Sequence, residues 1–277
     1  MNLKEFITLA LKEDIGNGDH TTLACIPENT TQKAKLLVKE QGMIAGVELA
    51  KNIFNQFDNT LQFEENIPDG TPVHKGEIVF TVTGKARSIL TTERLVLNCM
   101  QRMSGIATYT AKLNKLIEGT GAQLLDTRKT TPCFRYFEKW AVKIGGGQNH
   151  RFGLFDMIMI KDNHIDYAGS ITQAVNAAVN YLKEKNLSLK IVVEARNIDE
   201  VKEILTLHSV HRILLDNFTP EEMAKAVSFI NKKVETEASG GITENNIVSY
   251  ANTGVDFISV GALTHQIKSL DLSLKAF

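Results

Sequence analysis

The sequence predicts an α/β protein in which a C-terminal α/β barrel of about six strands follows an N-terminal α+β open-sandwich domain. Short apolar runs alternate with helical patterns through the second half, in cycles of roughly 20–30 residues, as βα units require. Most runs are continuously apolar, which is typical of strands buried on both faces of a parallel sheet. The expected strands are residues 122–127, 156–162, 190–195, 212–217, 234–239 and 257–262.

Polar residues end nearly every one of these strands, and this pattern favours a barrel over an open doubly wound sheet. In barrels the functional groups come from the C-terminal ends of several strands and converge on one face. A single polar ending often only begins a loop, but six endings together indicate a shared site. No Gly-x-Gly-x-x-Gly motif follows the first strand, which disfavours a dinucleotide-binding open sheet.

Helix-start signals lie between the expected strands. Thr219, Pro220 and Glu222 give an N-cap, a proline at the first helical position and a capping-box glutamate. Asn197 and Thr243 are the predicted N-caps of two further helices. The segments between the strands are therefore expected to be helices that cover the sheet.

The first hundred residues lack this rhythm and predict a separate α+β domain. Residues 1–14 have the pattern of an amphipathic helix, 33–57 of a strand, a turn and a helix, and 69–90 of β-rich runs between turn glycines. Residues 91–118 form a long helical stretch that is expected to bridge to the barrel. A domain boundary is therefore expected near residues 105–115.

Composition narrows the class of protein. A formal net charge of −1 over 277 residues argues against bulk nucleic-acid binding. Three cysteines without short pairing suit neither a disulfide framework nor a zinc site, and indicate a reducing compartment. Charges interrupt the N-terminal apolar residues, and no uncharged apolar run reaches the ~18 residues of a membrane helix. The sequence therefore predicts a cytoplasmic protein without a membrane span.

A dense group of basic residues between Asp126 and His164 predicts a cationic pocket. Arginine binds carboxylates or phosphates in bidentate fashion, and lysine acts as a point charge. In a nearly neutral protein such a pocket suits a small anionic substrate, such as a diphosphate with a carboxylated partner. The group comprises Arg128, Lys129, His150, Arg151 and Lys161.

Two glycine-containing loops, at 237–242 and 259–265, follow the last two expected strands. Loops in this position of a barrel commonly bind phosphate through backbone N–H groups, and glycine permits close approach. The helix expected from Thr243 would add its positive N-terminal end. Two ordinary turns are the alternative interpretation, and the phosphate site is favoured over them.

Glu194 and Asp216 end neighbouring expected strands and predict an acidic counterpart to the cations. They suit hydrogen bonds from ribose hydroxyls or a Mg²⁺ ion beside a diphosphate, and stabilise positive charge on a sugar ring. A salt bridge to a lysine is the alternative. Lys161 alone also suits a Schiff base, as in aldolases. Arg94 taken alone is a surface arginine.

Several long, ordered motifs resemble the quinolinate phosphoribosyltransferase family over almost the whole chain. They are EDIGNGDHTT (13–22), TTER with LN (91–98), SGIAT (104–108), DTRKTTP (126–132), EKWAVKIGGGQNHRFGL (138–154), IKDNHI (160–165), LLDNF (214–218), EASGGI (237–242) and VGALTH (260–265).

The resemblance implies a pentosyltransferase of NAD biosynthesis that joins quinolinate to phosphoribosyl diphosphate and releases nicotinate mononucleotide, diphosphate and CO₂. It implies an α/β sandwich over 1–108, an α/β barrel over 109–267 and a tail, 268–277, packed on the N-terminal domain. It also implies a homodimer with shared active sites, in which Arg94 comes from the neighbouring subunit. The resemblance leaves undecided whether the protein forms oligomers larger than a dimer.

The resemblance also implies residue roles. Lys129, Lys161, Glu194 and Asp216 are the expected catalytic residues, and the acidic pair is the expected Mg²⁺ site. His164 and His265 fall in matching motifs without an assigned role. The expected quinolinate and diphosphate contacts are Arg128, Lys129, His150, Arg151 and Lys161, the ribose contacts Glu194 and Asp216, and the 5-phosphate contacts Ser239, Gly240 and Gly261.

Two positions depart from the family pattern, and three alternatives accompany it. Cys133-Phe134 replaces the usual Gly-Leu, and Val192 stands where many members have a glutamate. A relative acting on another base, such as the paralogue associated with molybdate transport genes, is the first alternative, and an aldolase using Lys161 is the second. The third is a carrier domain, because 69–84 resembles biotinyl and lipoyl domains but lacks their lysine tripeptides.

Overall fold

The computed structural model describes residues 2–277, which cluster into two compact units. The first unit comprises the chain up to Ala111 together with Thr130–Gly146 and Leu263–Phe277, and the second comprises Lys112–Lys129 and Gly147–Ala262. Both units mix helices and strands, as the sequence predicts. No helix within residues 2–277 combines the length and apolar character needed to cross a membrane.

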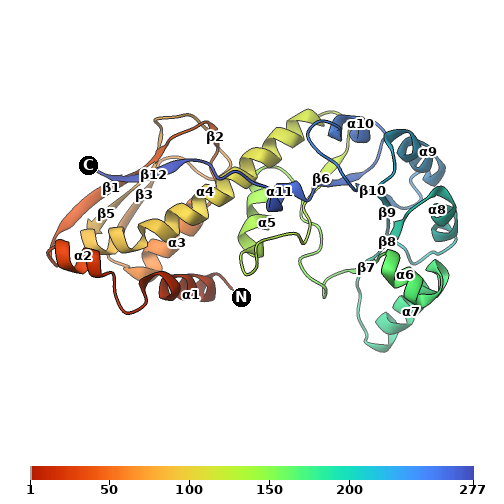
Figure 1. Cartoon of the computed structure of the whole chain (residues 1–277), viewed down its shortest axis with the longest axis horizontal. Coiled ribbons are helices and arrows are strands. Elements are labelled where there is room, and N and C mark those ends of the chain that lie inside the picture. The colour runs from red at the N-terminus through yellow and green to blue at the C-terminus, as the bar shows by residue number, and fades with distance from the viewer. Residues whose placement is uncertain (1) are drawn as a thin grey trace. The chain divides into compact units, whose positions relative to one another are not determined.

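The first unit is built on an antiparallel sheet with the order β12-β1-β5-β3. Alternate residues of β1 are buried, which is typical of a strand that packs one face against a core. The C-terminal strand β12 pairs with β1, and Leu274 lies opposite Leu36 (Figure 1). The strands are β1 (Thr31–Val38), β2 (Gly42–Met43), β3 (Gln62–Glu65), β4 (Pro72–Val73), β5 (Ile78–Lys85) and β12 (Leu272–Ala276).

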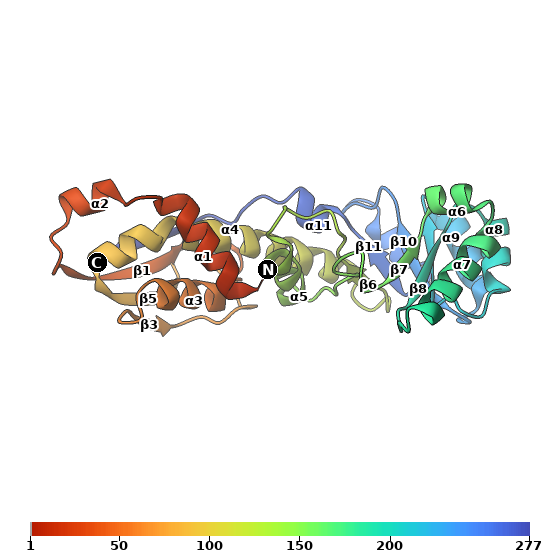
Figure 2. The ribbon, with the colours of Figure 1, turned by 90° about the horizontal axis from the view of Figure 1, so that it is seen from below.

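Helices pack beside this sheet. α1 and α3 lie side by side, and Gln56 of α3 donates a hydrogen bond to Thr8 Oγ1 of α1 at 2.8 Å (Figure 2). The rings of Phe54, Phe63 and Phe80 meet in the core between α3 and the sheet, at centroid distances of 4.6–6.1 Å. The helices are α1 (Leu3–Ile15), α2 (His20–Cys25), α3 (Val47–Phe57), α4 (Ala86–Leu116), α5 (Arg135–Ile144) and α11 (Ala262–His265).

The second unit is built on six parallel strands with the order β6-β11-β10-β9-β8-β7. All six lie inside the apolar runs that the sequence predicts as strands, and β8 is buried along its whole length. Among residues 2–277 no pairing joins β6 to β7, so closure of the barrel stays a prediction. The strands are β6 (Gln123–Leu125), β7 (Ile158–Ile160), β8 (Ile191–Ala195), β9 (Arg212–Asp216), β10 (Glu235–Ser239) and β11 (Phe257–Ser259).

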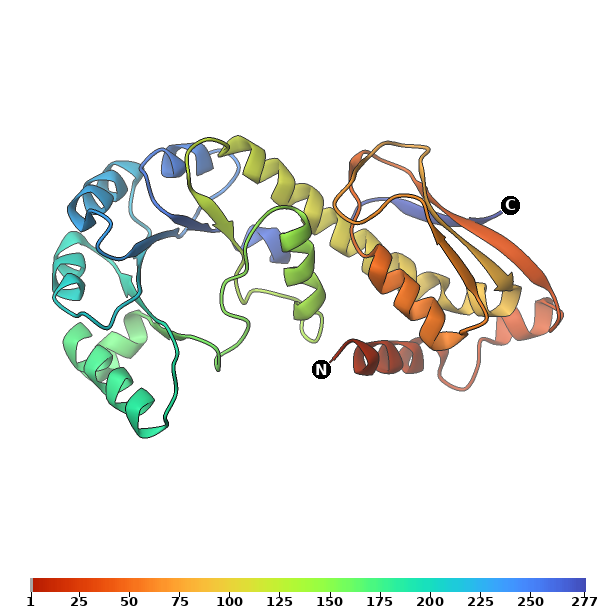
Figure 3. The ribbon, with the colours of Figure 1, turned by 180° about the vertical axis from the view of Figure 1, so that it is seen from behind.

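Helices between these strands lie on one face of the sheet, as Figure 3 shows for α7, α8 and α9. Two predicted N-caps are confirmed: Thr219 forms a capping box with Glu222, and Asn197 accepts from two backbone N–H groups at 3.0 Å. The helices are α6 (Asp162–Ala168), α7 (Ile171–Glu184), α8 (Ile198–Leu205), α9 (Pro220–Ile230) and α10 (Ile247–Ala251).

The predicted N-cap at Thr243 is wrong, because α10 begins four residues later with Asn246 as its N-cap. The Asn246 side chain explains the delay. Its Oδ1 accepts from Thr243 N at 2.7 Å and its Nδ2 donates to Gly241 O at 3.1 Å, which holds the intervening residues in a turn. Asparagine side chains compete with helical hydrogen bonds in this way. The helix end expected beside the glycine loop is therefore displaced.

Candidate active site

The second unit gathers all of the predicted site residues except Arg94. Since its strands are parallel, residues that follow them share one edge of the sheet. Arg94 lies exposed on α4 in the first unit. The structure places Arg128 and Lys129 after β6, Lys161 directly after β7, Glu194 in β8, Asp216 and Ser239 at the ends of β9 and β10, Gly240 after β10 and Gly261 after β11.

His150 and Arg151 reach this edge by another route, since they precede β7 in the chain. Gln148 forms a parallel bridge with Leu125, and its N–H donates to Leu124 O at 2.8 Å. The segment that leads to His150 therefore runs beside β6 in the same direction. The His150 N–H then donates to the buried carboxylate of Asp126 at 2.8 Å, which fixes the backbone at this point.

Positive charge is concentrated where Arg128 and Arg151 lie. Burial lowers the pKa of the half-buried Arg151, the charge of Arg128 lowers it further, and Asp156 opposes both effects. Two guanidinium groups that repel each other in a partly dry site are stabilised by an anion placed between them. This part of the site therefore suits an anionic ligand such as a carboxylate.

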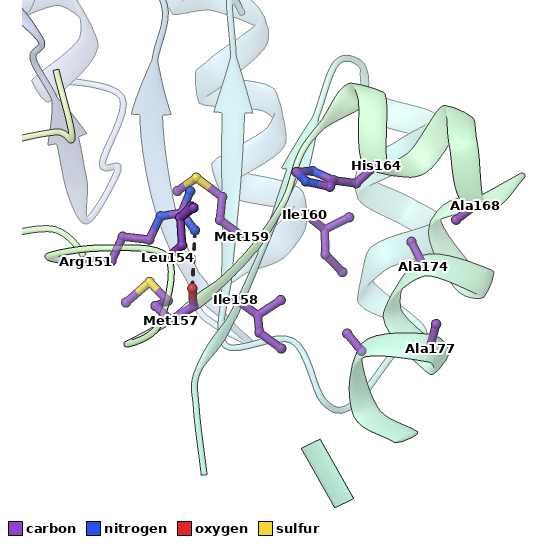
Figure 4. A pocket seen from close by; sticks show the side chains of 11 residues that line it. Arg151, Leu154, Met157, Ile158, Met159, Ile160, His164, Ala168, Ala174 and Ala177 are labelled. Atoms are coloured by element: carbon purple, nitrogen blue, oxygen red, sulfur yellow. Dashed lines mark hydrogen bonds between the residues drawn. The ribbon is translucent and has the colours of Figure 1, made fainter. Parts of the chain in front are cut away.

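The Arg151 guanidinium also borders a cavity of about 390 Å³ beside β7 (Figure 4). Its Nη1 donates to Met157 O at 3.3 Å, and His164 lines the same cavity. The rest of the lining is apolar, so the cavity suits a hydrophobic contact rather than an anion. Its lining comprises Arg151, Leu154, Met157, Ile158, Met159, Ile160, His164, Ala168, Ala174, Ala177 and Ala178.

The acidic side of the edge is formed by neighbouring strands β8 and β9. Glu194 is buried, and its Oε2 lies 3.4 Å from Lys161 Nζ. Burial raises the pKa of Glu194, and the charge of Asp216 also raises it, against the opposing effect of Lys161. The two carboxylates are thus close enough to repel each other, and Lys161 is the lysine paired with Glu194. Such a pair favours a cation or developing positive charge nearby.

The loop after β10 requires glycine at position 240. Gly240 has a φ of +95°, and a Cβ there would lie 2.8 Å from the backbone N of Asn217 and closer still to its side chain. The Asn217 N–H donates to Ser239 O at 2.9 Å, which ties this loop to the end of β9. Glycine therefore lets two strand ends approach each other, and the loop lies beside the carboxylate of Asp216.

Comparisons with known proteins match both parts of the chain to one family. Residues 19–104 match the quinolinate phosphoribosyl transferase N-terminal domain, and residues 106–275 match the C-terminal domain of the same family. A quinolinate phosphoribosyltransferase of Nicotiana tabacum is 47% identical over 99% of this chain and 82% of its own length. The chain belongs to the quinolinate phosphoribosyltransferase family.

Further relatives extend the match to bacteria and to solved structures. A probable nicotinate-nucleotide pyrophosphorylase of Bacillus subtilis is 39% identical over 99% of this chain and 93% of its own. The solved nicotinate-nucleotide pyrophosphorylase of Francisella tularensis is 41% identical, with a TM-score of 0.90 over 99% of this chain and 96% of that one. Membership of this family favours phosphoribosyl transfer over the aldolase and carrier alternatives.

The residues present suit Mg²⁺ only in combination with a ligand. No group of three or more His, Cys, Asp or Glu side chains within residues 2–277 is arranged to hold a metal. Glu194 and Asp216 form a pair of carboxylates, and Mg²⁺ usually binds through one or two carboxylates together with substrate phosphates and water. The donor set therefore matches a magnesium–diphosphate complex rather than a metal held by the protein alone.

Sequence reasoning missed a buried polar group in the interior of this sheet. Glu237 lies two residues before the end of β10 and is fully buried. Its carboxylate contacts Arg212, Ser259 and His150. A charged residue inside a strand that is otherwise predicted to be buried could have indicated this group. Charged residues are rarely buried without partners, so its position implies partners elsewhere in the sheet.

Proposed function

We propose that this chain is a decarboxylating quinolinate phosphoribosyltransferase. It transfers the phosphoribosyl group of phosphoribosyl diphosphate to quinolinate and yields nicotinate mononucleotide, diphosphate and CO₂. The observation that carries the proposal is the division of one sheet edge into a cationic part, at Arg128 and Arg151, and an acidic part, at Glu194 and Asp216. Curated relatives at 39–48% identity bear the name of this activity.

The cationic part binds the two carboxylates of quinolinate. Arg128 and Arg151 repel each other in the unliganded protein, so carboxylate binding between them relieves the repulsion. Bidentate arginine contacts also fix the plane of the ring, which aims its nitrogen at the anomeric carbon of the ribose. Lys129 and Lys161 add positive charge for the diphosphate.

The acidic part binds the sugar. Glu194 and Asp216 accept hydrogen bonds from ribose hydroxyls and stabilise the positive charge that develops at the anomeric carbon. Glu194 and Asp216 would hold Mg²⁺, which would supply charge neutralisation of the leaving diphosphate. Ser239, Gly240 and Gly261 provide the backbone N–H groups that hold the 5-phosphate.

The reaction needs no covalent enzyme intermediate. The ring nitrogen forms a bond to the anomeric carbon as the bond to the diphosphate oxygen breaks. The resulting pyridinium accepts the electron pair that remains when the bond from the ring to the adjacent carboxylate breaks and CO₂ leaves. A proton from water then replaces the carboxylate on the ring. The side chains contribute by orientation and electrostatic stabilisation alone.

A direct assay tests the activity. Purified protein is incubated with Mg²⁺, phosphoribosyl diphosphate and carboxyl-labelled quinolinate, and released ¹⁴CO₂ is counted with and without phosphoribosyl diphosphate. We expect release only with both substrates, loss of release with a chelator, and no mononucleotide from nicotinate. Equal turnover of nicotinate, or none of quinolinate, would contradict the proposal. Lys161→Ala is expected to abolish release, whereas Lys183→Ala, an exposed lysine of α7, leaves it unchanged.

The proposal includes a homodimer whose sites are completed by Arg94 of the neighbouring subunit. Arg94 is exposed on α4, as a residue offered to a partner requires. Mixing Arg94→Ala with Lys161→Ala tests this, because a mixed dimer of two such variants has one site with both residues intact. If subunits exchange freely, about a quarter of the wild-type activity returns. Recovery of none after verified exchange would show that Arg94 acts within its own subunit, and full activity of Arg94→Ala alone would show that Arg94 has no role.

A cytoplasmic location is also part of the proposal. It rests on charged residues near the N-terminus and unpaired cysteines. Plant relatives are named for chloroplasts or mitochondria, so location varies among relatives. Fractionation of the native cell, with activity and protein followed together, checks it.

A further inference from the structure

One buried carboxylate in the second unit has no part in the reaction proposed above. Glu237 lies in the interior of β10 with no exposed surface. Its Oε2 accepts from Arg212 Nη1 at 3.0 Å, and its Oε1 accepts from Ser259 Oγ. An ionised carboxylate so deeply buried is costly unless its charge is paired. Its position next to the site calls for a functional explanation as well as a structural one.

The third partner of Glu237 is the imidazole of His150, whose Nε2 lies 3.3 Å from Oε2. The other ring nitrogen, Nδ1, accepts from the backbone N–H of Arg151 at 2.6 Å. A neutral imidazole has one donor and one acceptor nitrogen. Since Nδ1 is the acceptor here, the ring proton lies on Nε2 and faces Glu237.

This arrangement argues against His150 as a direct substrate ligand. Nδ1 accepts from a backbone N–H, Nε2 lies 3.3 Å from the carboxylate of Glu237, and the side chain is 5% exposed. Its backbone N–H is likewise engaged, by Asp126. What His150 holds instead is the backbone of Arg151, the residue whose guanidinium faces the substrate carboxylates in the proposed reaction.

We propose that Glu237 is a positioning residue for quinolinate binding. It acts through His150: Glu237 orients the imidazole, the imidazole accepts the Arg151 N–H, and the Arg151 side chain is thereby aimed at the substrate. His150 is the intermediate link rather than a contact of the substrate. This inference rests on the proposed function, since quinolinate is the ligand that Arg151 is aimed at.

Charged groups from every neighbouring strand agree with this assignment. Arg212 from β9 approaches Glu237 from one side, and its guanidinium is shared with Glu235 and stacks 3.9 Å from the Phe257 ring centroid. Ser259 from β11 binds the other carboxylate oxygen. Glu237 is therefore held rigidly by two strands while its remaining contact is directed at His150. A rigid support of this kind is what an oriented ligand-binding group requires.

The first test reads the imidazole directly in the wild-type protein. ¹⁵N–¹H correlation spectra of the seven histidines distinguish the two tautomers, and a His150→Asn variant assigns the signal. We expect His150 to be the Nε2–H tautomer. Protonation on Nδ1 would overturn the proposal, because Nδ1 then has no lone pair for the Arg151 N–H. This measurement needs neither substrate nor a Glu237 variant that folds.

The second test is kinetic and uses a matched pair of substitutions. Glu237→Gln leaves one acceptor oxygen where three donors converge, and we expect the KM for quinolinate to rise about tenfold. The KM for phosphoribosyl diphosphate and kcat are expected to change less than about twofold. Glu235→Gln removes the other carboxylate on Arg212 without contacting His150, and should leave both KM values unchanged.

The outcomes separate this inference from the proposed function. If the wild-type protein does not convert quinolinate, the proposed function is wrong. The spectroscopic measurement of the His150 tautomer still tests the link from Glu237 to His150 in that case. An active enzyme whose quinolinate KM is the same in Glu237→Gln overturns the positioning role. Equal effects of Glu237→Gln and Glu235→Gln on quinolinate KM would also overturn it, since Arg212 would then be the cause.

Discussion

Two buried glutamates of the same parallel sheet have opposite electrostatic surroundings. Glu194 lies near the end of β8, where burial and the charge of Asp216 raise its pKa against the single ion pair with Lys161. Glu237 lies in the interior of β10, and the hydrogen bonds of His150 and Ser259, with the charge of Arg212, overcome burial and lower its pKa. At the strand end, Glu194 has too few positive partners to compensate its charge. In the interior of the sheet, the charge of Glu237 is compensated by its partners.

The difference separates a group arranged for a ligand from a group arranged for the fold. A carboxylate with too few partners destabilises the folded state and gains most when a cation, sugar hydroxyl or positive transition state arrives. A carboxylate with enough partners holds its neighbours in place and has nothing further to gain. Burial alone does not distinguish the two, because both side chains are buried. The count of compensating donors does.

We expect the largest effect from removing the buried carboxylate of Glu237. Glu237→Leu leaves Arg212 without its buried carboxylate partner and His150 without its contact on Nε2, and we expect a loss of about 3–5 kcal/mol in the free energy of unfolding at pH 7. Because the pKa of Glu237 is lowered on folding, its stabilisation is present above its ordinary value of 4.5 and is lost as pH falls through the folded value. Denaturant unfolding at pH 7 and at acid pH measures this.

The control for that experiment is Glu235→Leu, which removes a partly exposed partner of the same arginine. A partly exposed ion pair contributes roughly 0–1 kcal/mol. A loss at Glu235 as large as that at Glu237 would mean that Arg212, and not burial of the Glu237 charge, dominates. The interior would then not differ from the strand end in the way described above.

For Glu194 at the strand end, we expect a substitution to lower activity without lowering stability. Glu194→Gln removes the charge that meets the sugar, and we expect kcat to fall about 10²–10³-fold. The pKa of Glu194 is raised on folding, so its charge opposes folding at pH values above the folded value, and this penalty disappears below its ordinary value of 4.5. The variant is therefore expected to unfold at neutral pH no more easily than wild type. Marked destabilisation would show that Lys161 pairing outweighs burial.

The glycine loop after β10 offers a similar comparison between two neighbouring backbone positions, Gly240 and Gly241. Gly240→Ala forces a Cβ against Asn217 at a φ of +95°, and we expect a cost of about 1–3 kcal/mol with a raised KM for phosphoribosyl diphosphate. Gly241→Ala is the control, because its φ is +60° and its Cβ would meet nothing within 4 Å. That variant should cost only the left-handed backbone penalty and leave KM unchanged. Equal KM effects would locate the phosphate contact elsewhere.

The sequence predicts the six parallel strands well because strands buried on both faces leave continuous apolar runs, as at Ile191–Ala195. It also predicts Lys161, Glu194 and Asp216 as strand-end residues, since strand ends follow directly from strand positions. It fails at Thr243, where the Asn246 side chain competes with helix formation through local hydrogen bonds that no periodicity reveals.

The partners of Glu237 could not be predicted for a different reason. His150, Arg212 and Ser259 come from distant parts of the chain and meet only through strand order and register. A one-residue slip in that register would turn Glu237 to the other face of the sheet. Electrostatic compensation in the interior is therefore a property of the assembled sheet, whereas the residues at strand ends are readable from the chain.

The smallest expected effect concerns the departure from the family pattern at Cys133. Its φ of +63° is a left-handed conformation that costs a non-glycine residue roughly 1–2 kcal/mol, which glycine avoids at an entropic cost of about 0.5–1 kcal/mol. Cys133→Gly is therefore expected to stabilise the protein by up to about 1 kcal/mol, measured by denaturant unfolding.

The matched control is Cys133→Ala, which removes the thiol but keeps the strained backbone and should bring no gain. The neighbouring Phe134 stays in both variants, with its ring 4.9 Å from Phe137 and 5.5 Å from Phe6, so the aromatic packing of this loop is unchanged. If alanine stabilises as much as glycine, the exposed thiol and not the backbone is the source of the cost. If neither does, the aromatic contacts of Phe134 offset the strain, and the loop after Lys129 is held by packing rather than by a glycine turn.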